Sequence, residues 1–141
     1  MTAKEYLLQA KFLKQRINSK MSQMQQMRDL AITITQVISD MPKAKNASTS
    51  RMEDTITDIV DLENEISDDI KDLVALQKEI TMMIERLDKL EHKMILTERY
   101  IDGSDWCEIA DLLHYSVRWT QSLHGEALIA LQSVLDSEKT S

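Results

Sequence analysis

The sequence predicts an all-α protein, in which a long antiparallel, coiled-coil-like helical hairpin precedes a short helix-turn-helix. Three observations support this class. Two glycines and one proline in 141 residues leave few helix breakers. Aromatic residues make up 4% of the chain, and no run alternates polar and apolar residues as a half-buried strand does. Apolar residues instead recur every three or four positions along two long stretches.

The first long helix is expected to begin at a capping box and to end before Pro42. Thr2 is a good N-cap, and Glu5 stands three residues later. A heptad seam of about 40 residues follows, with one polar member, Lys20. Residues 42–50 have no periodicity and predict a polar loop. The seam consists of Tyr6, Ala10, Leu13, Ile17, Lys20, Met24, Met27, Ala31, Ile34, Ile38 and Met41.

The second long helix is predicted to begin near Ser50 and to carry a seam of its own. Its one polar exception is Asp69. We expect this helix to continue, with or without a bend, through Glu91, His92 and Lys93 into the C-terminal module. One seam position is filled by Ile59, Ile66, Leu73, Ile80, Leu87 and Met94, and the other by Leu62, Leu76, Met83 and Leu90.

The net charge is −7, and the basic and acidic residues are distributed unevenly along the chain. Residues 1–51 carry nine basic and three acidic side chains, residues 52–103 carry six and fifteen, and residues 104–141 carry two and six. A basic first helix and an acidic second helix favour an antiparallel pair. The acidic flank of the second helix is therefore expected to be solvated or to face Lys11, Lys14, Arg16 and Lys20; the alternative is a surface that binds another protein.

Two helices alone cannot cover their apolar stripes. We therefore expect a homodimer or higher oligomer, formed through the hairpin. The predicted domains are residues 1–91 for the hairpin, residues 92–135 for the helix-turn-helix and residues 136–141 for a frayed tail.

The C-terminal module is predicted to have two sharp breaks. Gly103 can adopt the left-handed conformation that ends a helix, and Ser104 is a good N-cap for the next one. Residues 114–116 form a three-residue turn in which Ser116 can cap the last helix. The expected buried faces are Ile109, Ala110 and Leu113 on the middle helix, and Thr120, Leu123, Ala127, Leu128 and Leu131 on the last.

These residues carry a resemblance to a known module. Arg99-Tyr100, Gly103, Trp106, Glu108-Ile109-Ala110, Leu113, Tyr115-Ser116, Leu123 and Ala127-Leu128 resemble region 4 of bacterial sigma factors, which reads the promoter −35 element. With the upstream helices, the chain resembles small phage and prophage proteins of the late-gene regulator type. That wider resemblance covers nearly the whole chain and includes Met41-Pro42, Met52-Glu53-Asp54, residues 59–63, Arg118-Trp119 and Leu123-His124-Gly125.

The resemblance implies a transcription regulator that binds double-stranded DNA at phage or prophage promoters. The expected roles are a guanine or phosphate contact for Arg118, a base-edge contact for Gln121 and a base or phosphate contact for Ser122. Trp119 would pack on sugar or thymine methyl groups. Arg99 would contact a phosphate from the first helix of the module.

The module is, however, poor in the basic residues that DNA affinity needs. After Arg99 the only Lys or Arg residues are Arg118 and Lys139, and Glu126 stands where related sequences carry Lys or Arg. Three arrangements would compensate: a dimer that doubles the contacts, phosphate contacts from the basic N-terminal helix, or docking on RNA polymerase. Two alternative functions stay open: a module that binds RNA polymerase or another protein without binding DNA, and a DNA-packaging accessory protein.

The sequence shows no enzyme signature, and no cofactor or metal is expected. The three histidines, His92, His114 and His124, lack metal-ligand spacing with Cys107 or with one another and are expected at the surface or in turns. A single cysteine fits a reducing cytoplasm, here that of a bacterial host. No apolar run is long enough for a membrane span.

Overall fold

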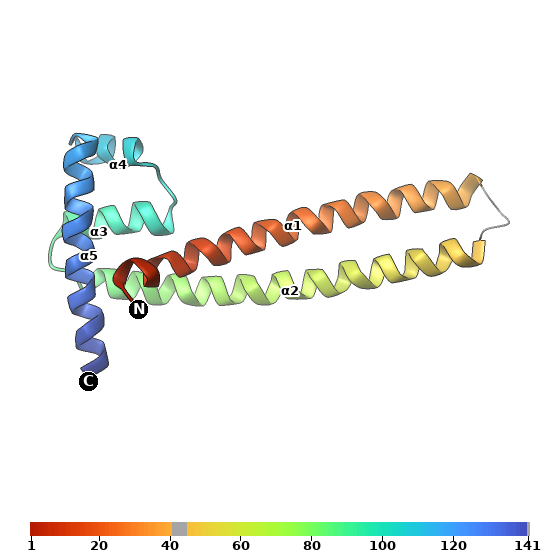
Figure 1. The fold of residues 1–141 in the computed structure, drawn as a ribbon, viewed down its shortest axis with the longest axis horizontal. Helices are drawn as coiled ribbons and strands as arrows, with labels where there is room; N and C mark the ends of the chain where they lie inside the picture. The colour runs from red at the N-terminus through yellow and green to blue at the C-terminus, as the bar shows by residue number, and fades with distance from the viewer. Residues whose placement is uncertain (41–44, 141) are drawn as a thin grey trace. The chain divides into compact units, whose positions relative to one another are not determined.

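The computed structural model describes the backbone of residues 1–40 and 45–140 and the side chains of residues 1–37 and 50–139. The helices are α1 (Ala3–Asp40), α2 (Lys45–Glu85), α3 (Leu90–Leu96), α4 (Trp106–Leu113) and α5 (Val117–Thr140), with a π-helical turn, η2 (Thr97–Ile101), after α3 (Figure 1). No strand occurs within the described ranges, so the predicted all-α class is confirmed. The chain forms two compact units: Lys14–Asp72, and Met1–Leu13 together with Leu73–Ser141.

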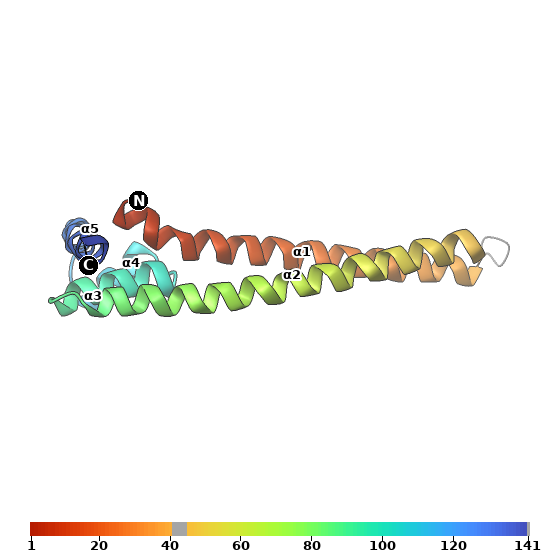
Figure 2. The ribbon, with the colours of Figure 1, turned by 90° about the horizontal axis from the view of Figure 1, so that it is seen from below.

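In the unit Lys14–Asp72, α1 and α2 run antiparallel beside each other (Figures 1 and 2). Ion pairs show the direction: Lys20 meets Asp69, and Arg28, further along α1, meets Glu63, which is earlier on α2. Ile17, Leu62 and Ile66 are buried, and the other predicted seam positions with described side chains are half-buried. The heptad pattern therefore identified correctly the faces that the two helices present to each other.

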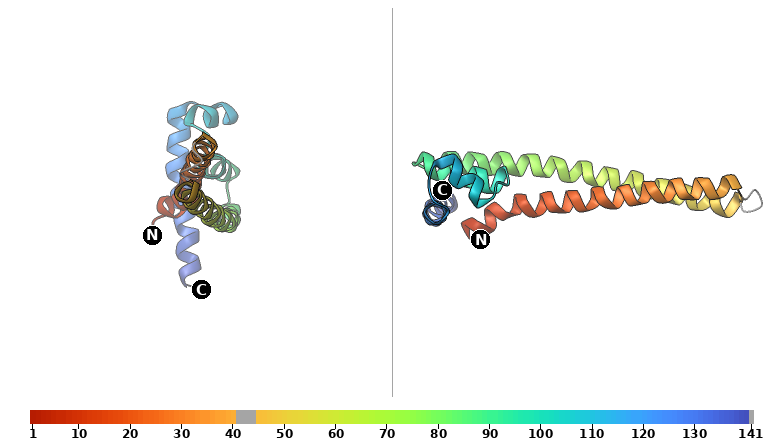
Figure 3. Two further views of the ribbon diagram at one scale, coloured as in Figure 1. Left: turned by 90° about the vertical axis from the view of Figure 1, so that its right-hand side faces the viewer. Right: turned by 90° about the horizontal axis from the view of Figure 1, so that it is seen from above.

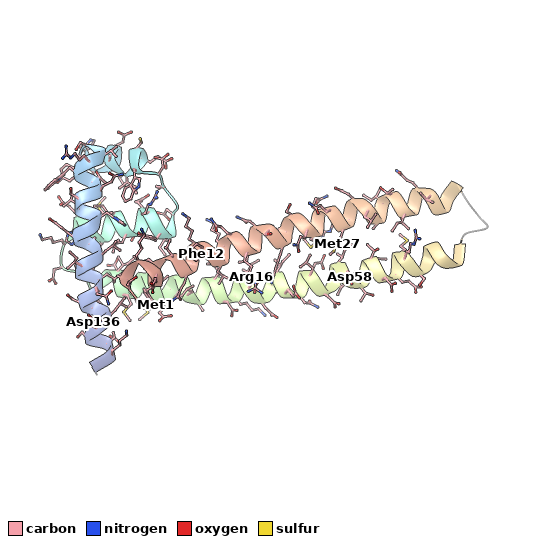
Figure 4. The ribbon with its side chains drawn as sticks, in the orientation of Figure 1. Met1, Phe12, Arg16, Met27, Asp58 and Asp136 are labelled. Carbon is pink, nitrogen blue, oxygen red and sulfur yellow. The ribbon has the colours of Figure 1, made fainter. Side chains whose placement is uncertain are left out.

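The two polar exceptions in the seams form an ion pair with each other. Lys20 Nζ lies 2.6 Å from Asp69 Oδ2, and their side chains are only 14% and 15% exposed. Arg16 Nε is 3.8 Å from the same carboxylate, and Glu65 is 3.7 Å from Lys20 (Figure 4 labels Arg16). A charge in an apolar seam is tolerated only opposite its partner, so this pair fixes the register of α1 on α2.

The expected pairing of basic and acidic helices thus holds for Arg16 and Lys20. Lys14 has no carboxylate within 4 Å among the described residues. Lys11 belongs to the other unit.

The second unit is built on the first turns of α1. The predicted capping box is present: Thr2 Oγ1 accepts from the N–H of Glu5 at 3.2 Å, and the N–H of Thr2 donates to Glu5 Oε2 at 3.1 Å. The start of α5 lies against α3 and α4, and its later turns cross the beginning of α1 and the end of α2 (Figures 1 and 3). The shared core comprises Ala3, Tyr6, Leu7, Ala10, Ile80, Ile84, Leu87, Leu96, Tyr100, Ala127 and Leu131.

The second long helix ends at Glu85 and does not continue through residues 91–93, contrary to the prediction. The N–H groups of Arg86 and Leu87 bond to the carbonyls of Met83 and Ile84, which tightens the last turn before α3 begins at Leu90. Leu87 is buried, but Leu90, a predicted seam residue, is 70% exposed. The chain changes direction here because Ile95 and Leu96 are buried in the cores that α3 shares with α5.

Three predicted boundaries also differ from the structure. The division at residue 91 separates segments that share one core, since Tyr6 and Ile84 pack with Ala127. Residues 136–140, predicted to fray, continue α5, and Gln132 Nε2 donates to Asp136 Oδ1 at 3.0 Å. Residues 45–50 of the predicted loop are the start of α2, and Pro42 lies outside the described residues.

Lys20→Met should destabilise the protein by about 1–3 kcal/mol in urea unfolding, because Asp69 is left half-paired in the seam. The double variant Lys20→Met/Asp69→Leu should lose less unfolding free energy than Lys20→Met, because it no longer carries the Asp69 charge in the seam. Arg28→Met, which breaks an exposed pair, is the control and should cost at most about 1 kcal/mol. Equal losses in the single and double variants would show that the pair does not hold the seam together.

Candidate functional site

The segment before α4 holds the predicted left-handed glycine. Gly103 has φ 75°, as expected. The N-cap of α4 is Asp105 rather than the predicted Ser104: Asp105 Oδ1 accepts from the N–H of Glu108 at 2.8 Å. Ser104 binds backwards instead, donating its N–H to the Glu98 carbonyl at 2.8 Å and its hydroxyl to Glu98 Oε2 at 2.9 Å. The segment between η2 and α4 is therefore held on one side by the bonds of Ser104 to Glu98 and on the other by the bond of Asp105 to Glu108.

The turn between α4 and α5 has the predicted length of three residues. His114 takes the left-handed conformation with φ 60°, and the N–H of Tyr115 donates to the Ala110 carbonyl at 3.0 Å, which closes α4. Ser116 caps α5 as expected, its Oγ accepting from the N–H of Trp119 at 3.1 Å. The direction of α5 is thereby fixed by backbone and cap bonds on both sides of the turn.

Thr120 connects this turn to the core. Its side chain is fully buried, and its hydroxyl donates to the Ser116 carbonyl at 2.9 Å. Leu123, one turn later, is buried with Ile95 of α3 and Ile109 of α4. The predicted inward residues are accordingly buried or half-buried. The start of α5 therefore packs on α3 and α4.

The four residues predicted to face outward do so. Arg118, Trp119, Gln121 and Ser122 are exposed, and Trp119 retains 49% of its accessible surface. Within the described structure, none of these side chains has a hydrogen bond, ion pair or ring contact. Tyr115 does not stack on Trp119 but donates to Glu91 at 2.5 Å, and this bond raises the Tyr115 pKa. The outward side chains are free to contact a partner.

Arg99 is placed differently from the other four site residues. Its guanidinium lies 4.5 Å from the centroid of the Trp106 ring, and its Nη1 donates to the Ser104 carbonyl at 3.3 Å. Arg99, the residue expected to contact a phosphate from the first helix of the module, therefore lies in the turn that follows α3 and not on α5. Glu126, the acidic residue noted in the sequence, lies 3.7 Å from His92 Nε2 on α3.

Arg99 lines a pocket of about 290 Å³ that the sequence did not predict. The other lining residues are Lys4, Leu8, Lys11, Tyr100, Trp106 and His124, all in the second unit. His124 Nε2 is 2.7 Å from the Tyr100 hydroxyl, and its ring meets the edge of Trp106 with centroids 4.8 Å apart. Burial, helped by the Arg99 and Lys4 charges, lowers the His124 pKa to about 4.

Two of the three histidines are thus not surface residues. His92 is 6% exposed and His124 is half-buried, while His114 is in the turn. One sequence signal pointed to the pocket: Lys4, Leu8 and Lys11 share a helix face at spacings of four and three. No comparable sequence pattern pointed to His124 as part of the pocket.

Comparisons with protein-family models, curated proteins and solved structures gave no match to this chain. In the described part of the chain, no helix is long and apolar enough to cross a membrane. The same residues contain no group of three His, Cys, Asp or Glu side chains that could hold a metal ion.

Ser116→Ala should lower the free energy of unfolding by about 1 kcal/mol, because the N–H of Trp119 loses its cap. Ser122→Ala is the control, because it makes the same chemical change at an exposed side chain that has no hydrogen bond in the described structure. Its free energy of unfolding should stay within about 0.5 kcal/mol of wild type. Urea unfolding measures both. Equal losses would rule out the cap as the feature that sets the start of α5.

The His124 pKa predicts a loss of stability in acid. The unfolded chain takes up the proton near pH 6.5 and the folded chain only near pH 4. Between these values the unfolded state binds more protons, so stability falls as the pH falls. The melting temperature of wild type should therefore drop more from pH 7 to pH 4.5 than that of His124→Gln, and an equal drop would contradict the assignment.

Proposed function

We propose that α4 and α5 form a sigma-region-4-like helix-turn-helix and that the protein is a DNA-binding transcription regulator acting at phage or prophage promoters. The observation that carries the proposal is the free outward face of the first turns of α5. A three-residue turn seats this helix, and Arg118, Gln121 and Ser122 project from it without partners in the described structure. In a helix-turn-helix, the first turns of the second helix reach base edges in the major groove.

The chemistry of this face suits base reading. Arg118 offers a donor fork for guanine, and Gln121 offers a donor and an acceptor for adenine. The first N–H groups of α5 and its dipole add an attraction for phosphate. With Arg118 as the one cation of this face, affinity per copy is modest and its salt dependence shallow.

A second copy of the chain would compensate for the sparse charge. The outer side of α2 carries exposed apolar residues in the unit Lys14–Asp72: Ile56 (49%), Val60 (46%) and Ile70 (44%). Ile56 and Ile70 are two heptads apart, so they lie on one stripe of the helix. We infer that this stripe, outside the α1–α2 seam, is where the hairpin oligomerises and doubles the number of DNA contacts.

A protein-binding module is the second candidate, and one observation favours it. The residues around the α4–α5 turn form an exposed apolar group: Leu112 (49%), Tyr115 (37%), Val117 (36%) and Trp119 (49%). Exposed aromatic and aliphatic groups of this kind are typical of protein interfaces. RNA polymerase is the partner to test first, because the sigma-like resemblance implies it.

DNA binding is tested by fluorescence anisotropy of full-length protein against a library of phage-genome fragments at two salt concentrations. Wild type should bind one or a few promoter fragments saturably and more weakly at higher salt. Arg118→Ala/Gln121→Ala should weaken that binding by at least about tenfold, since each bidentate base contact contributes about 1–3 kcal/mol.

The matched control is Arg51→Ala/Gln77→Ala, which removes the same side-chain types from α2 and should bind as wild type does. If protein shown to be helical binds none of the fragments, the DNA-binding proposal is wrong and the protein-binding module becomes the favoured function. Pull-down of purified RNA polymerase, lost in Trp119→Ala, would then establish that second function.

A further inference from the structure

The pocket beside α5 concentrates positive charge in an acidic protein. Lys4, Lys11 and Arg99 all line it, and no carboxylate is among its lining residues. Within the described structure, none of the three cations has an Asp or Glu within 4 Å. Like charges gathered without counter-charges repel one another, and that repulsion is relieved when an anion binds among them.

The local backbone is unusual at the same place. The turn Thr97–Ile101 is π-helical, with the N–H of Asp102 bonded to the Thr97 carbonyl at 3.0 Å. Such turns are rare and are frequently found at functional sites. This turn brings two consecutive residues, Arg99 and Tyr100, to the pocket.

Aromatic and neutral groups complete the walls. Trp106 holds the Arg99 guanidinium against its ring, and the hydrogen bond from Arg99 to the Ser104 carbonyl leaves other guanidinium donors free in the described structure. His124 stays neutral at pH 7, so its ring adds no charge of its own. The site offers two lysine ammonium groups and an arginine fork, the donors that suit a phosphate group, while the Tyr100 hydroxyl is already bonded to His124.

We propose that this pocket binds a small ligand that carries a phosphate group. The volume of about 290 Å³ is at the lower end for ligand pockets, so the ligand is small. The pocket differs from the DNA-reading face in the residues that line it: His124 is six residues beyond Arg118, about 120° around the helix, although it adjoins Gln121, three residues earlier. Because Trp106 opens α4 and His124 belongs to α5, the ligand would bridge the two helices of the module.

Full-length protein is titrated with inorganic phosphate, and with adenosine monophosphate in parallel, against sodium chloride of equal ionic strength. Histidine side-chain and backbone NMR signals report binding. Phosphate should shift Arg99, Tyr100, Trp106 and His124 saturably, and the His124 pKa should rise because an anion offsets the Lys4 and Arg99 charges. Chloride should give no saturable shift.

Lys4→Gln/Lys11→Gln should weaken phosphate binding by at least about tenfold, since each lysine makes a charge-assisted contact. Lys14→Gln/Lys71→Gln makes the same charge change at two exposed lysines of the other unit that have no ion pair with a described residue, and it should leave the affinity unchanged. Far-UV circular dichroism confirms that each variant is folded.

Three results would overturn the proposal. The first is the absence of saturable shifts with either phosphate compound. The second is an equal loss of phosphate affinity in the pocket variant and in the control variant, which would show that the lysines attract anions non-specifically. The third is weaker duplex DNA binding in Lys4→Gln/Lys11→Gln without any binding of free phosphate, which makes the lysines DNA-backbone contacts. The phosphate titration contains no DNA, so its failure is distinguishable from failure of the proposed regulator function.

Discussion

Every long helix here has an apolar stripe that must be covered, and the two units meet this requirement by different means. In Lys14–Asp72, α1 and α2 cover each other, and the Lys20–Asp69 pair fixes their register within an apolar seam. In the other unit, the same two helices are covered by α3 and α5 through Leu7, Ile84 and Ala127. That second core seats α5, and the exposed face at its start depends on this support.

Much of this architecture was predictable because it rests on local chemistry. The Thr2–Glu5 box, the left-handed Gly103 and the Ser116 cap each depend on residues within one or two turns. The heptads predicted the buried faces for the same reason, since side-chain direction along a helix follows from its period. The outward positions of Arg118 and Gln121 followed from the same geometry.

The rest could not be predicted because it depends on contacts between distant segments. The heptad continues through Leu87 even though the helix ends at Glu85, so periodicity could not reveal the change in direction. The pocket joins Lys4 to Arg99 and His124, residues about a hundred positions apart in sequence. Arg99 looked like a surface cation, and its position on the Trp106 ring became evident only from the fold.

The central claim is that the first turns of α5 read DNA. Backbone NMR of full-length protein, titrated with a promoter duplex chosen from the fragment library, tests it most directly. The account predicts that the largest shifts fall on residues 117–122, with residues 14–37 and 50–72 changing little. Shifts centred on the acidic side of α2, or none at residues 117–122 when the duplex is bound, would contradict it.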